Sequence, residues 1–439
     1  MPKRFFATTI FLVPLLSASV FLSAATQSHQ SEQQAQSERG RILFKRSFKV
    51  AEGFGYRLGN PEVVLFDRHL GPDAKSCLEC HSIGGEAGAG ENNKNVFVGL
   101  DPALERRLAR GNERNSTAMW GLGAVQALAQ EMSGELKTIR QSALEQAKRT
   151  NEAVTVALVS KGVSFGSLTA TPQGELDTSQ IIGVDPGLEI RPFHAKGTRG
   201  TIRRFTFEAM WRHAGLEAPE MLKRRYPLQG NWERYDHDGD GVVNEIATEQ
   251  ITDLSVFQAL LPTPQEVQPK DSAEQQKVQR GEKLFHANCA SCHISRLPLN
   301  KAEVTIEGAM GQKDTKVDLQ EILPKQNDQY WVALYSDMKR HDMGPGLAEK
   351  NGQISDNKVT GVDPRWFITT KLWGVADTAP YLHDGRAKTL EEAIVAHGGE
   401  SEPARQAFQA MSIEQKGQLI SFLKSLRSPD ALTAGKKRY

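Results

Sequence analysis

Apolar positions along this chain recur mainly at helical spacing, and the short alternating runs that are typical of strands are few. The last helix is expected to begin at Ser412, where the Ser-x-x-Gln sequence fits a capping box. Its apolar stripe consists of Ile413, Leu419, Ile420, Leu423 and Leu426. A second capped helix is expected to start at Thr389 and to end at Gly398, and residues 202–213 form a third. The pattern predicts a mainly α fold with long loops.

The first 25 residues follow a different pattern. Lys3 and Arg4 precede an apolar run, Phe5–Leu22, and the small residues Ser23–Ala25 then offer a cleavage site. This order is typical of a secretory signal peptide, with an uncleaved membrane anchor as the alternative. We expect an exported, periplasmic protein that keeps no stable membrane span after cleavage. Residues 26–38 are rich in Gln and Ser and are expected to form a disordered lead-in.

All four cysteines of the chain lie in two Cys-x-x-Cys-His segments. These are Cys77-Leu-Glu-Cys80-His81 and Cys289-Ala-Ser-Cys292-His293. Four cysteines in an exported protein would ordinarily form disulfides, but this spacing with the trailing His is the attachment signature of c-type haem. The sulfurs form thioethers to the haem and the His ligates the iron. Redox-active or zinc-binding cysteine pairs are the alternative. The sequence therefore predicts two covalently bound haem c groups.

Each haem segment follows an Arg-Gly-x-x-Leu-Phe sequence, at residues 39–44 and 280–285. This internal repeat indicates two cytochrome-c-like haem domains, of which the first has a longer stretch between the helix and the haem segment. Residues 261–269 contain three prolines and are expected to form the linker. The predicted domains are therefore residues 39–262 and 270–430.

Charge narrows the range of partners. The 439 residues carry 54 basic and 53 acidic side chains, for a formal net charge of +1. A chain this close to neutrality lacks the basic excess that nucleic-acid binding requires, so we expect no nucleic-acid partner.

The first predicted domain also contains the Asp-x-Asp-x-Asp-Gly start of a calcium loop. Its candidate ligands are Asp236, Asp238, Asp240 and Asn244. The loop departs from an EF-hand because its twelfth position is Ala247, and Glu245 and Glu249 are out of register. A Ca²⁺ site is predicted here, with a solvated acidic turn as the alternative.

The expected helix at residues 202–213 carries a candidate for the first haem site. Ile202, Phe205, Ala209 and His213 fall on one face, which could place His213 in an apolar pocket over the haem. There it would ligate iron or act as a general acid-base catalyst. His194 is the alternative candidate for this role. The alternative without a functional role is an ordinary histidine of the hydrophobic core.

Several segments resemble the di-haem oxidoreductase family, whose members are related to the di-haem cytochrome c peroxidases. The segments that carry the resemblance are Asp377–Ile394, Tyr335–Leu347, Lys371–Gly374 and Asn115–Gly123. The similarity extends over most of residues 40–427 and is patchy from 125 to 190. It implies two c-type haem domains that face each other. Relatives include hydrogen peroxide reductases, an enzyme that oxidises protein tryptophans and rubber-cleaving oxygenases.

The resemblance also implies roles for individual residues. His383 is the first candidate for the distal ligand of the second haem and Met343 the second, because relatives carry Met where this chain has Leu382. Trp120 would bridge the haems, with core packing as the alternative role. Glu131 is a weak candidate for the distal acid.

We therefore expect a peroxidase-like di-haem oxidoreductase. The first haem would be reactive, and the second would pass on electrons from a small c-type cytochrome or copper protein. Two alternatives stay open, a non-catalytic electron carrier and an oxygenase that acts on an organic substrate.

Overall fold

The structure is a computed structural model that describes residues 16–55, 74–90, 95–98, 111–323, 325–349 and 362–429. The first fifteen residues of the expected signal peptide lie outside the described residues. In the described part of the chain, no helix is both long enough and apolar enough to cross a membrane.

The described chain is rich in helix, as predicted. Its α-helices are α1 (Leu16–Lys45), α3 (Leu122–Thr150), α4 (Ile202–Ala209), α5 (Pro219–Arg225), α6 (Thr248–Ala259), α7 (Ser272–Asn288), α9 (Leu390–Val395), α10 (Glu402–Ala410) and α11 (Ile413–Leu423). A π-helical turn, Met210–Ala214, extends α4. Short 3-10 helices are η1 (Val50–Glu52), η2 (Cys77–Glu79), η5 (Trp232–Arg234), η6 (Val375–Asp377) and η7 (Gly399–Ser401).

The strands are short and form small antiparallel sheets. They are β1 (Asn95–Val98), β2 (Gly111–Arg114), β3 (Val154–Ser160), β4 (Val163–Ala170), β5 (Leu176–Asp177), β6 (Gln265–Glu266), β7 (Leu297–Leu299), β8 (Glu303–Ile306), β9 (Thr315–Asp318), β10 (Lys325–Gln326), β11 (Gln329–Val332), β12 (Arg340–Asp342), β13 (Trp366–Ile368) and β14 (Leu426–Arg427). The pairs are β1–β2, β3–β4–β5, β6–β14, β8–β9, β10–β11–β7 and β12–β13.

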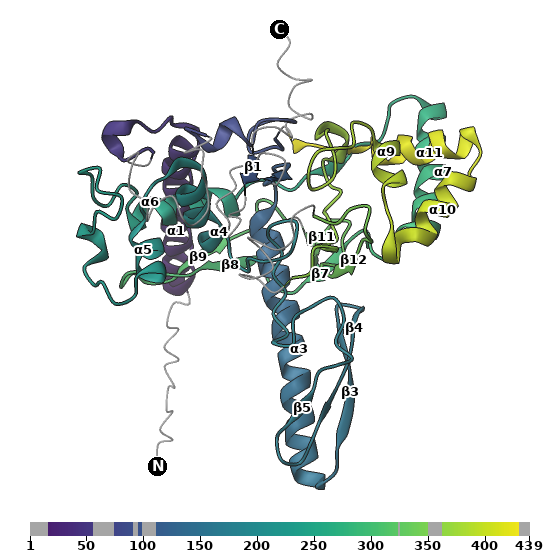
Figure 1. Cartoon of the computed structure of the whole chain (residues 1–439), viewed down its shortest axis with the longest axis horizontal. Helices are drawn as coiled ribbons and strands as arrows, with labels where there is room; N and C mark the ends of the chain where they lie inside the picture. Colours follow the sequence, from purple (N-terminus) through teal and green to yellow (C-terminus); the bar gives the residue numbers. More distant parts are fainter. Residues whose placement is uncertain are drawn as a thin grey trace, which may run out of the picture.

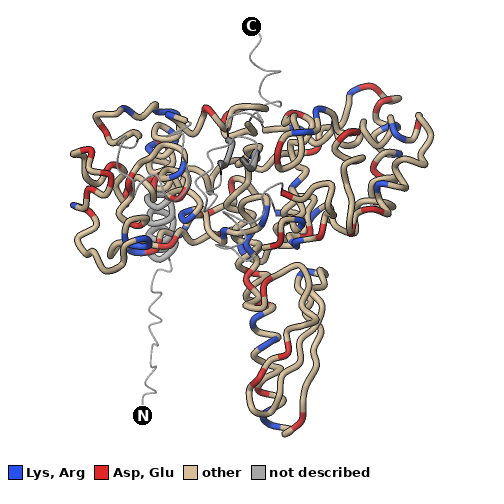
Figure 2. The backbone as a smooth tube through the Cα atoms, viewed as in Figure 1, with Lys and Arg blue, Asp and Glu red and all other residues tan. Residues whose placement is uncertain are grey.

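The described chain forms two lobes and an arm (Figure 1). Helices α1, α5 and α6 lie in one lobe, and α7, α9, α10 and α11 lie in the other. The arm consists of α3 and the β3–β4–β5 sheet, and it projects from the region between the lobes. Figure 2 shows basic and acidic residues interspersed along both lobes and the arm, so each part presents mixed charge.

Each lobe is organised by one close crossing of two helices. Gly40 of α1 packs against α6, where a Cβ atom would lie 2.0 Å from the Asp253 carbonyl oxygen. Gly281 of α7 packs against α11 in the same way, with 1.9 Å to the carbonyl oxygen of Gln418. Because both glycines belong to the Arg-Gly-x-x-Leu-Phe sequences, the internal repeat corresponds to a repeated helix pair.

The buried hydrophobic residues of the described chain form two cores, and the boundary between these cores does not coincide with the linker. The larger core joins α1, α3, α4 and α6 and also takes in strands β7, β8 and β9 from the second half of the sequence. The smaller core is built mainly from α7, α9, α10 and α11. The linker itself contributes β6, which pairs with β14 at the end of the described chain.

The expected disordered lead-in at residues 26–38 is wrong, because these residues lie within α1. The Gln33 side chain exchanges two hydrogen bonds with the backbone of Asp318, at 2.8 and 3.0 Å. Directly after the segment, Arg39 donates two hydrogen bonds to the Asp253 carboxylate. These long-range contacts hold a polar helix that composition alone would leave unfolded.

The predicted helix caps are confirmed. Ser412 and Gln415 form a capping box at the start of α11, and Thr389 and Glu392 form one at the start of α9. The helix expected at residues 202–213 also forms, and its last turn is π-helical.

The helix crossing in the second lobe can be tested at Gly281. Gly281→Ala should lower the free energy of unfolding by at least about 2 kcal/mol, because the added methyl group overlaps the α11 backbone. Gly417→Ala is the matched control, since nothing lies within 4 Å of a Cβ atom there. It should gain up to about 1 kcal/mol from helix propensity. Equal stability of the two variants in urea unfolding would contradict the crossing.

Candidate haem sites

The first Cys-x-x-Cys-His segment lies on η2 and the turn that follows it. The His81 Nδ1 atom is 3.1 Å from the carbonyl oxygen of Gly88. Burial lowers the pKa of His81 to about 4, so its imidazole is neutral at physiological pH. When Nδ1–H donates to Gly88, the lone pair of Nε2 is left for a metal ion.

The second segment begins at the C-terminus of α7 and repeats this arrangement. The His293 Nδ1 atom is 2.9 Å from the Tyr335 carbonyl oxygen, and burial lowers the pKa of His293 to about 4. A backbone carbonyl therefore sets the tautomer of each haem-segment histidine.

The four cysteines form no disulfide. Burial raises the pKa of the Cys77 thiol to about 12 and that of Cys289 to about 11. Reactive cysteine pairs need a depressed thiol pKa, so these two environments do not suit thiol redox chemistry. They do suit sulfurs that are consumed in thioether bonds. The donor set at both segments thus fits a covalently attached haem.

A cavity of ≈ 150 Å³ opens beside the first segment. Both histidines that the sequence put forward for this site, His194 and His213, line it together with His81. His213 comes from the π-helical turn after α4. The His194 Nδ1 atom is 2.9 Å from the Thr198 hydroxyl, which leaves its Nε2 available. The choice between the two histidines stays a prediction.

Three basic side chains line the same cavity, Arg114, Lys196 and Arg212. Haem carries two propionate carboxylates, which basic side chains can balance. Ion pairs with Glu349 hold Arg114 and Lys196 in place, so the basic wall of this cavity is fixed before any ligand enters.

A larger cavity, of ≈ 420 Å³, opens beside the second segment. This volume is within the usual range for cofactor sites, about 300–1,000 Å³. Aromatic and aliphatic side chains form much of its wall, among them Phe285, Phe367, Leu372, Leu390 and Phe408. Such a wall suits the apolar face of a porphyrin.

The two distal-ligand candidates for the second site both line this cavity. The His383 ring stacks on Phe367, with centroids 4.5 Å apart. The Met343 sulfur is 3.9 Å from the Ser401 hydroxyl, which donates to it. Neither contact shows the side chain directed at His293.

A third residue of this cavity, His397, was missed by the sequence reasoning. Its ring centroid is 6.5 Å from that of His293. Its Nδ1 atom is 2.8 Å from the Ala393 carbonyl oxygen, so its Nε2 is also left for a metal ion. The sequence signal that could have pointed to His397 was its position between the capped helix α9 and the glycines Gly398 and Gly399.

The two cavities are neighbours. Asn115, Ser116, Thr117 and Ala195 line both of them. The first three belong to one of the segments that suggested the family. The residues shared by the two candidate haem sites therefore all have short side chains, and three of these are polar.

Trp120 lies fully buried beside these shared residues and lines neither cavity. Its Nε1–H donates to the Glu86 carbonyl oxygen at 2.9 Å, in the loop after the first haem segment. A Cβ atom on Gly374, from the second half of the chain, would lie 2.6 Å from the Trp120 ring. Trp120 thus packs between segments of both sites.

Glu131, the weak candidate for a distal acid, lines neither cavity. Its carboxylate accepts hydrogen bonds from the backbone N–H groups of Asn300 and Lys301 and pairs with Lys161. It therefore ties α3 to the β7–β8 turn, and the distal-acid prediction for Glu131 is wrong.

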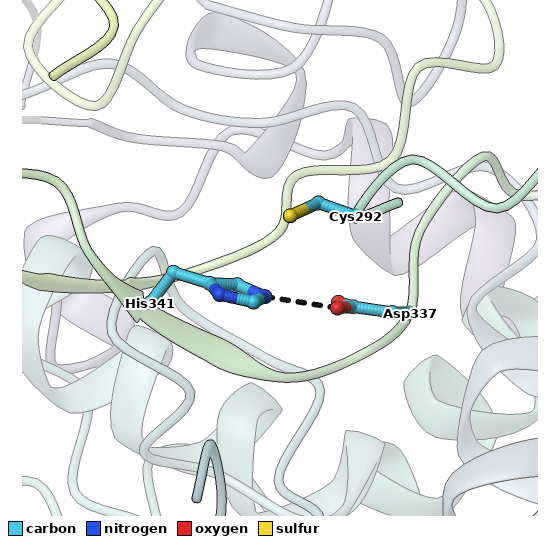
Figure 3. A group of neighbouring side chains, drawn as sticks. All are labelled: Cys292, Asp337 and His341. Carbon is cyan, nitrogen blue, oxygen red and sulfur yellow. Dashed lines mark hydrogen bonds and ion pairs between the residues drawn. The ribbon is translucent and has the colours of Figure 1, made fainter. Parts of the chain in front are cut away.

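Three side chains beside the second site, those of His341, Asp337 and Glu400, are joined by hydrogen bonds. Figure 3 shows His341 directed at Asp337, with Cys292 beside the pair. The Nε2 atom of His341 is 2.8 Å from a carboxylate oxygen of Asp337, and its Nδ1 atom is 2.8 Å from a carboxylate oxygen of Glu400. Although burial opposes the charge, hydrogen bonds to the carboxylates raise the pKa of His341 to about 11. Both ring nitrogens are protonated donors, so His341 is no metal ligand in this state.

The role of His341 follows from the backbone contacts of its partner, Asp337. The Asp337 backbone N–H donates to the Cys292 carbonyl oxygen at 2.8 Å. Two residues earlier, the Tyr335 carbonyl oxygen orients His293. The imidazolium therefore fixes the loop that sets the tautomer of the haem-segment histidine.

The candidate calcium residues also gather in the structure. Ligand oxygens of Asp236, Asp238 and Asp240 all lie within 4.8 Å of one another. Asn244 is exposed and adopts a φ of 51°. Its role as a ligand stays a prediction.

His341→Ala should destabilise the protein by about 3 kcal/mol, because it leaves the buried Asp337 carboxylate without its cation. The raised pKa gives the sign of the pH dependence. The stabilisation is complete below pH 6.5, the ordinary value, and is lost as the pH rises toward about 11. The stability gap between parent and variant should therefore shrink with rising pH. His286→Ala, an exposed control on α7, should cost less than about 0.5 kcal/mol. A gap that widens with pH would contradict the assignment.

Comparison with known proteins now adds to this geometry. No curated protein matches the chain. Among solved structures, it is similar to a hydrazine synthase of Kuenenia stuttgartiensis, with 19% identity over 40% of this chain and 55% of that one, and a TM-score of 0.25. It is also similar to a MauG-like protein associated with microbial copper homeostasis, with 19% identity over 53% of this chain and 68% of that one, and a TM-score of 0.26. The chain thus spans just over half the length of the first of these proteins.

A family model gives the more specific match. Residues 221–426 match the model described as "Di-haem oxidoreductase, putative peroxidase". The matched region includes α6, the acidic loop of residues 236–244, the second haem segment and most of the residues that line the second cavity. This region of the chain is therefore similar to the di-haem oxidoreductase family.

Proposed function

We propose that this protein is an exported c-type di-haem oxidoreductase with peroxidase-like activity. The observation that carries the proposal is the common wall of the two cavities, because each cavity is also lined by its own Cys-x-x-Cys-His segment. Two redox groups held in adjoining cavities can exchange electrons through the few residues between them. The family match supports the oxidoreductase part of this proposal.

A bound haem supplies a redox-active iron, which transfers electrons when protein ligands hold both axial positions and reacts with small molecules when one is open. The two sites differ in what they offer to those positions. At the second site, His293 and His397 are the residues that would hold the iron. Metal–imidazole bonds are about 2 Å long, so two rings on one ion have centroids about 6 Å apart. The separation of 6.5 Å between these rings supports that assignment.

His397 therefore replaces His383 and Met343 as our first candidate for the distal ligand. We assign the second site to electron transfer, since two neutral imidazoles would hold its iron. The stacking of His383 on Phe367 supports a role in the cavity wall instead.

The first site is the reactive one in this proposal. His81 would hold the iron, and His213, which lines the same cavity, would act as a proton donor and acceptor. A proton held at the His213 ring could be passed to a substrate oxygen when its bond breaks, which is ordinary general acid-base chemistry. A π-helical turn carries His213, and such turns occur frequently at functional sites.

Electrons would come from a small donor protein, either a c-type cytochrome or a copper protein. Export to the periplasm is proposed from the basic and apolar order of residues 3–25 and agrees with the covalent haem attachment.

The ligand assignment at the second site can be tested by electron paramagnetic resonance of the oxidised holoprotein. His397→Ala should convert the low-spin signal of the second haem to a high-spin signal, because one axial position opens. Met343→Leu and His383→Ala are the matched controls, and both should keep the low-spin signal. Loss of that signal in either control, with its retention in His397→Ala, would overturn the assignment.

The peroxidase proposal can be tested by ligand binding and turnover. The reduced parent protein should bind one equivalent of carbon monoxide, at the first haem, and should reduce hydrogen peroxide with a reduced donor protein. His213→Ala should lower that turnover by at least about 100-fold, the usual contribution of an acid-base group. His194→Ala is the comparison variant and should retain most of the activity. A parent that binds no carbon monoxide would instead be an electron carrier.

A further inference from the structure

The acidic loop has a second group of carboxylates beside it. Glu217, Asp238 and Glu245 place ligand oxygens within 4.8 Å of one another. Asp238 also belongs to the group formed with Asp236 and Asp240, so it joins the two sets. Glu217 precedes α5 and is far from the loop in sequence. The fold therefore brings two further carboxylates to the middle aspartate of the motif.

These additional carboxylates are deeply buried. The exposed fraction is 2% for Glu217, 1% for Asp238 and 7% for Glu245. Removing one carboxylate from water is costly, and gathering three of them adds their mutual repulsion. Such a group needs either protons or a cation.

One oxygen of the group has no hydrogen-bond partner. The Glu245 Oε2 atom accepts from the Glu217 backbone N–H at 2.6 Å, whereas its Oε1 atom is buried and accepts no hydrogen bond. Gly53 covers the same side chain, since a Cβ atom there would lie 2.3 Å from the Glu245 carboxyl carbon. An oxygen that is held out of water among other carboxylates is placed as a cation ligand would be.

Electrostatics favours the same conclusion. Burial raises the pKa of Glu217 to about 8 and that of Glu245 to about 10, and neighbouring carboxylates raise both further. The charged groups that shift these two values are all acidic.

We propose that Glu217 and Glu245 complete a Ca²⁺ site with the three aspartates of the loop. Calcium takes six to eight oxygen ligands at about 2.3–2.6 Å, so ligand oxygens on one ion lie up to about 5 Å apart. The 4.8 Å limit within each group satisfies this condition. Magnesium usually binds one or two carboxylates and several waters, so a set of five carboxylates suits Ca²⁺ better.

In the proposed site, Glu217 and Glu245 take the place of the missing twelfth ligand, because tertiary contacts bring them to the loop. In the linear register, Glu245 comes two residues before the expected position, and Glu217 is outside the motif altogether. A bound ion would join the segment before α5 to the loop that leads into α6. Glu217, in that segment, is only four residues after His213.

Isothermal titration calorimetry of chelator-treated holoprotein with Ca²⁺ tests the proposal. The parent should bind one equivalent of Ca²⁺. Glu245→Gln and Glu217→Gln should each weaken binding by at least about tenfold. Glu233→Gln, an exposed control on η5, should match the parent.

Two results would overturn the proposal, namely no binding at millimolar Ca²⁺ or unchanged affinity in both Gln variants. Equal affinity for Mg²⁺ would overturn the choice of ion. If a variant folds poorly, the parent alone decides the question, since Ca²⁺ must raise its midpoint of thermal unfolding as a ligand of the native state does.

Discussion

The close crossing of two helix backbones in each lobe is the constraint on which both haem sites depend. Gly40 and Gly281 allow the crossing because no side chain separates the helices. The phenylalanine one turn further on then packs against an aromatic ring of the partner helix, at 5.3 Å between Phe44 and Phe257 and 5.1 Å between Phe285 and Phe422. Each of these phenylalanines has its ring centroid 6.4 Å from the histidine of its haem segment. The crossing therefore determines where each histidine lies.

The sequence reveals the parts of this arrangement that depend on neighbours along the chain. The paired Cys-x-x-Cys-His segments, the repeated Arg-Gly-x-x-Leu-Phe sequences and the capping boxes are all local, and the helices they predict are present. The resemblance is patchy at residues 125–190 because this stretch forms most of the arm, which lies outside both lobes (Figure 1).

The parts that sequence reasoning missed are those that only tertiary contacts create. His397 faces His293 because helix α9 ends beside the second cavity, and no spacing rule connects the two residues. Glu217 reaches Asp238 through the turn before α5, although a motif search stops at the loop itself. The helical lead-in has the same explanation, since Gln33 is held by the backbone of Asp318. Composition describes the free energy of an isolated segment and omits such partners.

The two haem segments share the same Cys-x-x-Cys-His signature but have different surroundings. This difference agrees with the different roles proposed for the two sites. Around the second site, His293 is oriented by Tyr335, and the imidazolium of His341 ties that loop to two carboxylates. Fixed ligands would suit the electron transfer proposed for this site, because little would have to move when the charge of an iron ion changes. Around the first site, His213 lies in a single π-helical turn. This turn is continuous with α4 at one end and leads at the other end to Glu217, which belongs to the buried group of carboxylates. In its proposed role as a proton donor and acceptor, His213 would need a cavity that admits the substrate. A short turn between two anchored ends would allow small adjustments without unfolding the helix.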